Sequence, residues 1–99
     1  MTRSGIGRVT PVIPAWRVAA EGVGVLYARH GARGAMPDCG TDAGLALAAL
    51  RQGFAGIVFR GRPGIARKLS AIARRLGARV IARGRPRAVI SVRPQTRTS

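Results

Sequence analysis

Four basic residues share one side of a helix that we expect over residues 63–77. Arg67 and Lys68 are followed seven residues later by Arg74 and Arg75, so the two pairs stand about 10 Å apart along the helix axis. Cationic groups arranged in this way can bind the phosphates of a polyanion such as nucleic acid. We therefore predict a polyanion-binding site at these four residues, which would contact phosphates and be indifferent to base sequence.

A second basic site is expected just before that helix, in residues 60–64 (RGRPG). No Ser, Thr, Asp or Asn is present there to cap the helix, so free backbone N–H groups and the helix dipole favour an anion. The segment also follows a strand, and open α/β sheets bind ligands at the carboxyl ends of their strands. We predict that Arg60 and Arg62 bind an anion. The alternative is an ordinary turn with solvated arginines.

Residues 29–33 (RHGAR) are similar to the phosphate-binding signature of the histidine phosphatase superfamily, in which a strand is followed by RHG and a second arginine. The resemblance implies that His30 accepts the phosphoryl group while Arg29 and Arg33 hold the phosphate. That superfamily uses a second histidine, whereas this chain contains one. A surface loop is therefore the favoured interpretation, and a small phosphate-handling enzyme is the alternative.

Cys39 is the single cysteine, so the chain can form neither an internal disulfide nor a cysteine-based zinc site. With His30 nearby in the sequence and a helix beginning a few residues later, Cys39 could be a nucleophile. A buried cysteine at the end of a strand is the more common arrangement. We therefore predict no catalytic residue, no metal site and no cofactor, and an enzymatic role is less expected than a binding role.

The helix over residues 63–77 is the clearest structural prediction. Pro63 suits its first position and Gly77 the left-handed position after its end. The apolar residues Ile65, Leu69, Ile72 and Leu76 form one stripe, which Ala66 and Ala73 widen. We expect this stripe to face the core. An Asp at Leu69 or Ile72 should then unfold the protein.

The neighbouring elements complete a parallel α/β unit. Residues 55–60 and 79–82 read as buried strands, and Asp42 can cap a helix over residues 43–52 that ends at Gly53. That helix is apolar on nearly every side, so we expect protein to cover it. We predict one small α/β domain over residues 1–99, with a mostly parallel sheet of four or five strands, βαβ crossovers, and flexible ends at residues 1–7 and 93–99.

The remaining segments are less regular. We expect an edge strand in residues 8–13, a loop in residues 31–36, a short strand around residues 37–39, a basic turn in residues 83–87 and a last strand in residues 88–92. Residues 15–29 can form a helix, or residues 23–28 can form a strand. Apolar periodicity favours the helix, whereas the glycines at 22 and 24 favour the strand. We favour the helix.

Residues 38–53 (DCGTDAGLALAALRQG), with residues 72–78 and the pair Arg85–Pro86, resemble a family of short uncharacterised bacterial proteins. That family shares a DC-x4-G-x-AL-x-AL-x2-G core followed by a strand, a helix and a closing RP. The resemblance implies a helix before the DC pair, which supports a helix in residues 15–29. The family has no known activity, so the resemblance implies no site residue.

The sequence carries a large excess of positive charge. Eighteen basic residues face three acidic ones, and every acidic residue lies at or before position 42. Such a field attracts polyanions, although GC-rich coding sequence would also favour arginine over lysine. We predict a small basic protein of the bacterial cytoplasm, with a non-enzymatic binding or accessory role. Nucleic acid or another polyanion is the expected partner, a protein partner or a second copy is a further candidate, and a membrane is not expected because no span is present.

Overall fold

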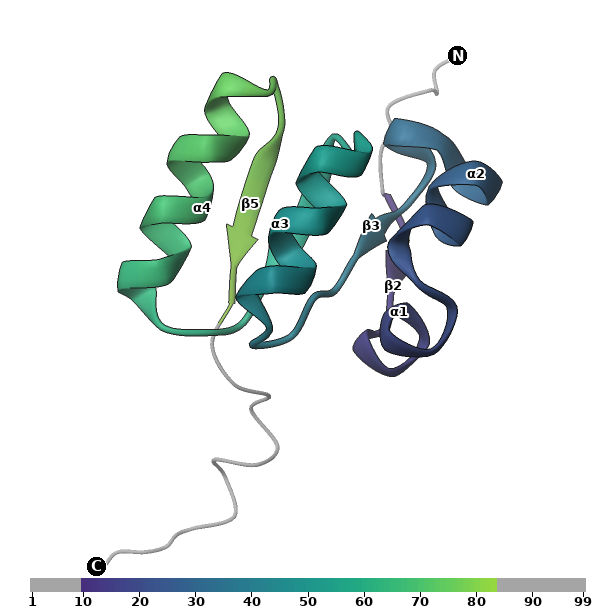
Figure 1. Cartoon of the computed structure of the whole chain (residues 1–99), viewed down its shortest axis with the longest axis horizontal. Helices are drawn as coiled ribbons and strands as arrows, with labels where there is room; N and C mark the ends of the chain where they lie inside the picture. Colours follow the sequence, from purple (N-terminus) through teal and green to yellow (C-terminus); the bar gives the residue numbers. More distant parts are fainter. Residues whose placement is uncertain (1–9, 84–99) are drawn as a thin grey trace, which may run out of the picture.

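The computed structural model describes residues 10–83, which form four helices and four short strands (Figure 1). In chain order the elements are β2 (Val12–Ile13), α1 (Ala15–Glu21), α2 (Val23–Gly34), β3 (Met36–Pro37), α3 (Ala43–Gln52), β4 (Gly56–Phe59), α4 (Pro63–Arg75) and β5 (Arg79–Ala82). The predictions for residues 1–7, 88–92 and 93–99 lie outside the described residues, as does most of the basic turn predicted at residues 83–87.

The β4–α4–β5 unit confirms the parallel crossover expected from the sequence. β4 and β5 pair in parallel, with Gly56 opposite Arg79 and Phe59 opposite Ala82. All four residues of β4 are buried, and Ile57 and Phe59 belong to the main hydrophobic core. The expectation that residues 79–82 form a buried strand is wrong, because Arg79 and Ala82 of β5 are exposed and the two residues between them are partly exposed. Helices α3 and α4 lie side by side along this pair of strands (Figure 1).

The expected sheet of four or five strands is not what the described residues form. They contain two separate two-stranded parallel sheets, β2–β3 and β4–β5, which are linked by one isolated parallel bridge between Asp38 and Val58. Prolines explain the short first sheet, because a proline donates no backbone hydrogen bond. Pro11 and Pro14 flank β2, and Pro37 ends β3.

Residues 15–21 and 23–34 are helical, which confirms a helical structure over the alternative strand, although as two helices and not one. Gly22 separates α1 from α2 with a φ of 89°, and Gly31 bends α2 with a φ of 76°. Glycine adopts such positive φ values without a steric penalty, so Gly22 and Gly31 determine where the chain turns. The prediction of a loop over residues 31–36 is wrong in most of its length, because α2 continues to Gly34 and β3 begins at Met36.

Helix α3 begins and ends as predicted. The Asp42 side chain accepts a hydrogen bond of 2.9 Å from the backbone N–H of Leu45, and Gly53 follows the helix with a φ of 120°. Its inner face is buried through Ala46, Ala49 and Leu50, but the expectation that protein covers all of it is wrong for the described residues. The outer residues are solvent-exposed: Gly44, Ala48, Arg51 and Gln52.

Helix α4 is amphipathic as predicted, but its buried face is narrower than the predicted stripe. The buried residues are Ala66, Leu69 and Ala73, whereas Ile65 and Ile72 are each 37% exposed. Leu76 lies just past the helix and is 52% exposed. Small alanines on both sides of Leu69 let the helix backbone lie close to the strands, so the larger side chains lie at the rim. Of the predicted stripe, Ala66, Leu69 and Ala73 are therefore in the core, and Ile65, Ile72 and Leu76 are not.

Candidate functional site

Helix α4 lies at one edge of the molecule, with α1 and α2 at the opposite edge (Figure 1). The four residues predicted to bind a polyanion are all exposed on it: Arg67, Lys68, Arg74 and Arg75. Helical geometry arranges them as two rows, because residues seven apart are nearly in line while adjacent residues are about 100° apart around the axis. We call Arg67 with Arg74 the first row and Lys68 with Arg75 the second row.

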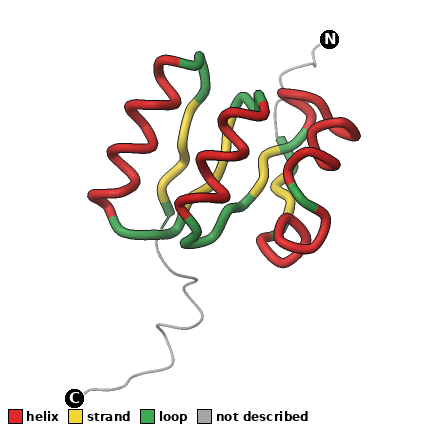
Figure 2. Tube along the Cα trace, viewed as in Figure 1, coloured by secondary structure: helices red, strands yellow, loops and turns green. Residues whose placement is uncertain are grey.

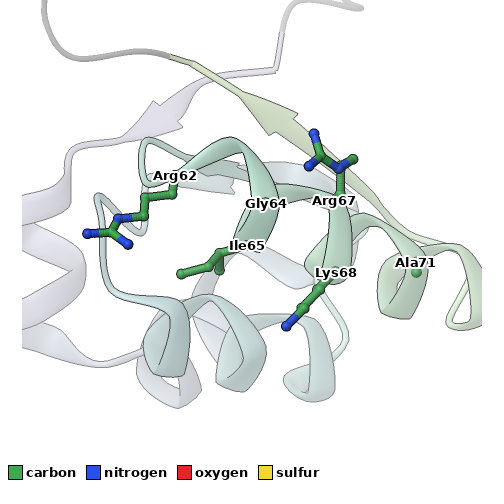
Figure 3. Close-up of a pocket in the computed structure, with 6 residues that line it drawn as sticks. All are labelled: Arg62, Gly64, Ile65, Arg67, Lys68 and Ala71. Atoms are coloured by element: carbon green, nitrogen blue, oxygen red, sulfur yellow. The ribbon is translucent and has the colours of Figure 1, made fainter.

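A shallow depression of about 590 Å³ opens on α4 at the N-terminal ends of these rows (Figure 3). Gly64 and Ala71 line it between Arg67 and Lys68, which point away from one another. Arg62, which precedes the helix, lines the same depression. The structure therefore brings a residue of the second predicted site, Arg62, together with two residues of the first.

Arg62 and the basic residues of α4 and β5 form no ion pair with an acidic side chain within residues 10–83. Glu21, in α1, accepts hydrogen bonds from Arg17 at 2.7 Å and from Arg29 at 3.0 Å, so its charge is paired with these two arginines. These contacts, led by the hydrogen bond from Arg17, lower the pKa of the Glu21 carboxyl from its ordinary value. Asp42 caps α3. The acidic side chains are thus used elsewhere in the fold.

The third acidic residue, Asp38, accounts for Arg60. The Asp38 carboxylate is buried and accepts hydrogen bonds from the Arg60 Nε at 2.8 Å and from the backbone N–H of Gly40 at 2.9 Å. Asp38 follows β3 and Arg60 follows β4, so this ion pair ties together the carboxyl ends of two strands. The Asp38 carboxylate offsets the charge of Arg60. Of the two predicted anion-binding residues, Arg62 is the one without an acidic partner in residues 10–83.

The loops after β3 and β4 come together at one edge (Figure 2). A larger depression, of about 690 Å³, is lined by residues of these loops. Thr41, Arg60, Arg62 and Arg83 line it together with the start of α4. Arg62 is the N-cap residue of α4, and no side chain caps the helix there, as the sequence predicted. Sequence reasoning missed Thr41 and Arg83. The rule that ligands bind at the carboxyl ends of strands could have indicated Arg83, since β5 ends at Ala82.

Cys39 is a buried structural thiol, which confirms the favoured interpretation. It is 2% exposed, and its Sγ donates a weak hydrogen bond of 3.9 Å to the carbonyl oxygen of Pro37. Burial raises the pKa of the thiol to about 12, with smaller contributions from the negative charges of Asp38 and Asp42. A thiol with this pKa forms almost no thiolate at neutral pH, so Cys39 is not an activated nucleophile.

The phosphatase-like signature lacks the structure that its chemistry needs. Arg29 and His30 lie inside α2, and no strand precedes them as the superfamily signature requires. The His30 Nε2 is buried and has no hydrogen-bond partner within the described residues, and Arg29 is paired with Glu21. Residues 29–33 therefore form neither the surface loop that we favoured nor a phosphate cradle.

Other kinds of site have little support in the described part of the chain. Residues 10–83 contain no group of three or more His, Cys, Asp and Glu side chains placed to hold a metal ion. None of the helices in that range has the length and hydropathy of a membrane span. No family model, curated protein or solved structure matches this chain, so the family resemblance of residues 38–53 stays a prediction.

Proposed function

We propose that the protein is a non-enzymatic binding protein that holds duplex nucleic acid through its phosphates, using the exposed side of α4. The observation that carries this proposal is the set of basic residues around α4 and β5 that form no ion pair within residues 10–83. The set comprises Arg62, Arg67, Lys68, Arg74, Arg75, Arg79 and Arg83. Unpaired cations concentrated on one edge raise the local concentration of a polyanion without requiring a shaped pocket.

The aromatic residues favour a duplex over single strands. Proteins that bind single strands without sequence preference stack bases on exposed aromatic rings beside a basic groove. Phe54 and Phe59 are each 1% exposed, and the Tyr27 ring packs edge-to-face on Phe54 with the centroids 5.3 Å apart. Trp16 is exposed but belongs to α1, at the far edge from α4 (Figure 1). No aromatic ring is therefore available beside the basic rows.

The expected affinity is modest and depends on salt. Each phosphate contact releases condensed counterions, so the logarithm of the binding constant falls by about 0.9 per contact for each tenfold rise in salt. Four contacts from α4 correspond to a slope of about −3.6, and binding of this kind has a Kd of roughly 10⁻⁴–10⁻⁶ M at physiological salt. The contacts are to phosphates, so changing the base sequence should alter the affinity little.

The test is a fluorescence-anisotropy or mobility-shift titration of a duplex at several salt concentrations. A quadruple variant replaces the predicted residues with glutamine, which keeps helix propensity nearly constant: Arg67→Gln, Lys68→Gln, Arg74→Gln and Arg75→Gln. A control variant removes the same charge away from α4: Arg17→Gln, Arg29→Gln, Arg33→Gln and Arg51→Gln.

We expect the α4 variant to stay folded, to lose most of its duplex affinity, and to show a salt slope smaller by about 3 to 4. The control variant should retain most of its affinity, because its cations lie elsewhere or are paired with Glu21. Equal losses in the two variants would mean that net charge alone attracts the duplex. Unchanged binding by the α4 variant would exclude α4 as the interface and favour coding bias as the origin of the arginines.

A further inference from the structure

Helix α4 is exposed around more of its circumference than a helix packed on a sheet usually is. Of its residues, only Ala66, Leu69 and Ala73 are buried, and they lie within about 60° of one another around the axis. The side facing away from the strands is free over more than half a turn, and it forms an edge of the molecule (Figure 1). The helix therefore projects far enough to be inserted into a concave surface.

The line along the middle of that exposed side carries almost no side chain. Gly64 and Ala71, both exposed, lie on it seven residues apart, with the first row on one side and the second row on the other. We call Gly64 and Ala71 the crest of the helix backbone; the longer side chains on either side of it form the walls of the shallow depression. An added Cβ at Gly64 would have the Arg67 Nη2 as its nearest contact beyond the local backbone, at 4.0 Å, so the space along this line is open up to that guanidinium. A backbone crest flanked by two rows of long cations can approach a surface closely while the cations reach sideways.

We propose that α4 inserts lengthwise into the major groove of B-form DNA, with its two cation rows contacting the phosphates of opposite strands. An α-helix with its side chains is about 10–12 Å wide, and the major groove of B-form DNA is about 12 Å wide and about 8.5 Å deep. The crest faces the base edges but offers them no hydrogen-bonding group. Insertion therefore adds shape selectivity without base readout.

Groove insertion predicts different affinities for two duplexes that carry the same charge. The major groove of A-form RNA is deep and narrow and does not admit a helix. On RNA, α4 can contact phosphates only from outside, with one row at a time. The protein should therefore prefer B-form DNA to an RNA duplex of the same length and sequence. This preference rests on the proposed phosphate binding, but it is a separate property of the helix shape.

The experiment compares DNA and RNA duplexes of one sequence at one salt concentration. We expect wild-type protein to bind the DNA at least tenfold more tightly. Ala71→Trp places a bulky neutral side chain on the crest, and should reduce DNA affinity to the RNA level while RNA affinity stays the same. Leu76→Trp is the matched control, because Leu76 is exposed beyond the second row, and it should change neither affinity.

A third duplex tests the groove directly. DNA whose cytosines carry a bulky neutral group at C5 has an obstructed major groove with unchanged phosphates, and it should bind like RNA. Equal affinity for all three duplexes, unaffected by Ala71→Trp, would overturn groove insertion and leave phosphate binding in place. Tighter binding to RNA than to DNA would also overturn it. Failure to bind any duplex at low salt would overturn the proposed function itself.

Discussion

Leu69 and Ile72 belong to one apolar stripe in the sequence, but the structure gives them different environments. Leu69 is 4% exposed and packs in the core, whereas Ile72 is 37% exposed at the rim of α4. The substitutions Leu69→Asp and Ile72→Asp introduce the same charge three residues apart on one helix. Sequence reasoning predicts that both unfold the protein, and the structure predicts that only the first does.

The magnitudes separate the two variants. Removing a buried leucine costs about 2–5 kcal/mol, and burying the new carboxylate without a partner adds an effective penalty of several kcal/mol. Together these approach the whole free energy of unfolding of a small domain, about 5–15 kcal/mol. Ile72→Asp loses at most about 2 kcal/mol of partial burial. Lys68 and Arg75, one helical turn away on either side, then recover about 0.2–0.5 kcal/mol per pair.

Thermal and urea unfolding followed by circular dichroism measure the difference. Leu69→Asp should lack a cooperative transition, while Ile72→Asp should melt cooperatively, with Tm lowered by no more than about 15 °C at roughly 4–8 °C per kcal/mol. Ile72→Asn controls for the added charge. If both Asp variants unfold, the buried face of α4 extends over the whole stripe and includes Ile72. If both melt like the wild type, α4 does not pack on the core at all.

Three further predictions follow from single contacts. The Cys39 thiol should react with thiol reagents only after unfolding. Its folded pKa of about 12 lies above the ordinary value of 9.0, so its contribution to the free energy of unfolding should be lost as pH rises from about 9 to 12. Cys39→Ala should remove this pH dependence of stability. Gly61→Ala should lower the free energy of unfolding by about 1–3 kcal/mol in urea titrations, because the new Cβ would overlap the Cζ of the buried Phe59 ring. Arg60→Gln should lower the urea midpoint by leaving a buried carboxylate unpaired, whereas Arg62→Gln should weaken duplex binding and leave that midpoint unchanged.

Features that depend on neighbouring residues could be predicted from the sequence. The Asp42 cap, the proline at the start of α4 and the glycines that follow α3 and α4 act within one helical turn, and each occurs as expected. The strands β4 and β5 were recognisable because short apolar runs stand between such signals. For the candidate site, the same local patterns identified the exposed cations of α4 and its uncapped start.

Features set by packing could not be predicted in the same way. How much of the apolar stripe of α4 is buried depends on how closely Ala66 and Ala73 approach the strands, and periodicity alone does not show that Ile65 and Ile72 stay at the rim. The ion pair between Asp38 and Arg60 joins residues 22 positions apart, so no local pattern indicates it. The extent of the sheet depends on which backbone groups find partners, and the prolines beside β2 and in β3 restrict that pairing.

The distribution of acidic residues has a kinetic consequence. Glu21 lies in α1 at one edge of the molecule, and the unpaired cations of α4 lie at the opposite edge (Figure 1). Glu21 offsets part of the positive charge of α1 and α2, whereas the cations of α4 form no ion pair within residues 10–83, so the positive charge is greater at the α4 edge. A polyanion therefore exerts a torque that turns α4 toward it before contact. Such steering raises association rate constants above the roughly 10⁵–10⁶ M⁻¹s⁻¹ of unsteered encounters. It weakens once the Debye length shrinks to about 10 Å near 0.1 M salt. Added salt should then first reduce how often the two molecules meet in a productive orientation, and less strongly shorten the time they stay together.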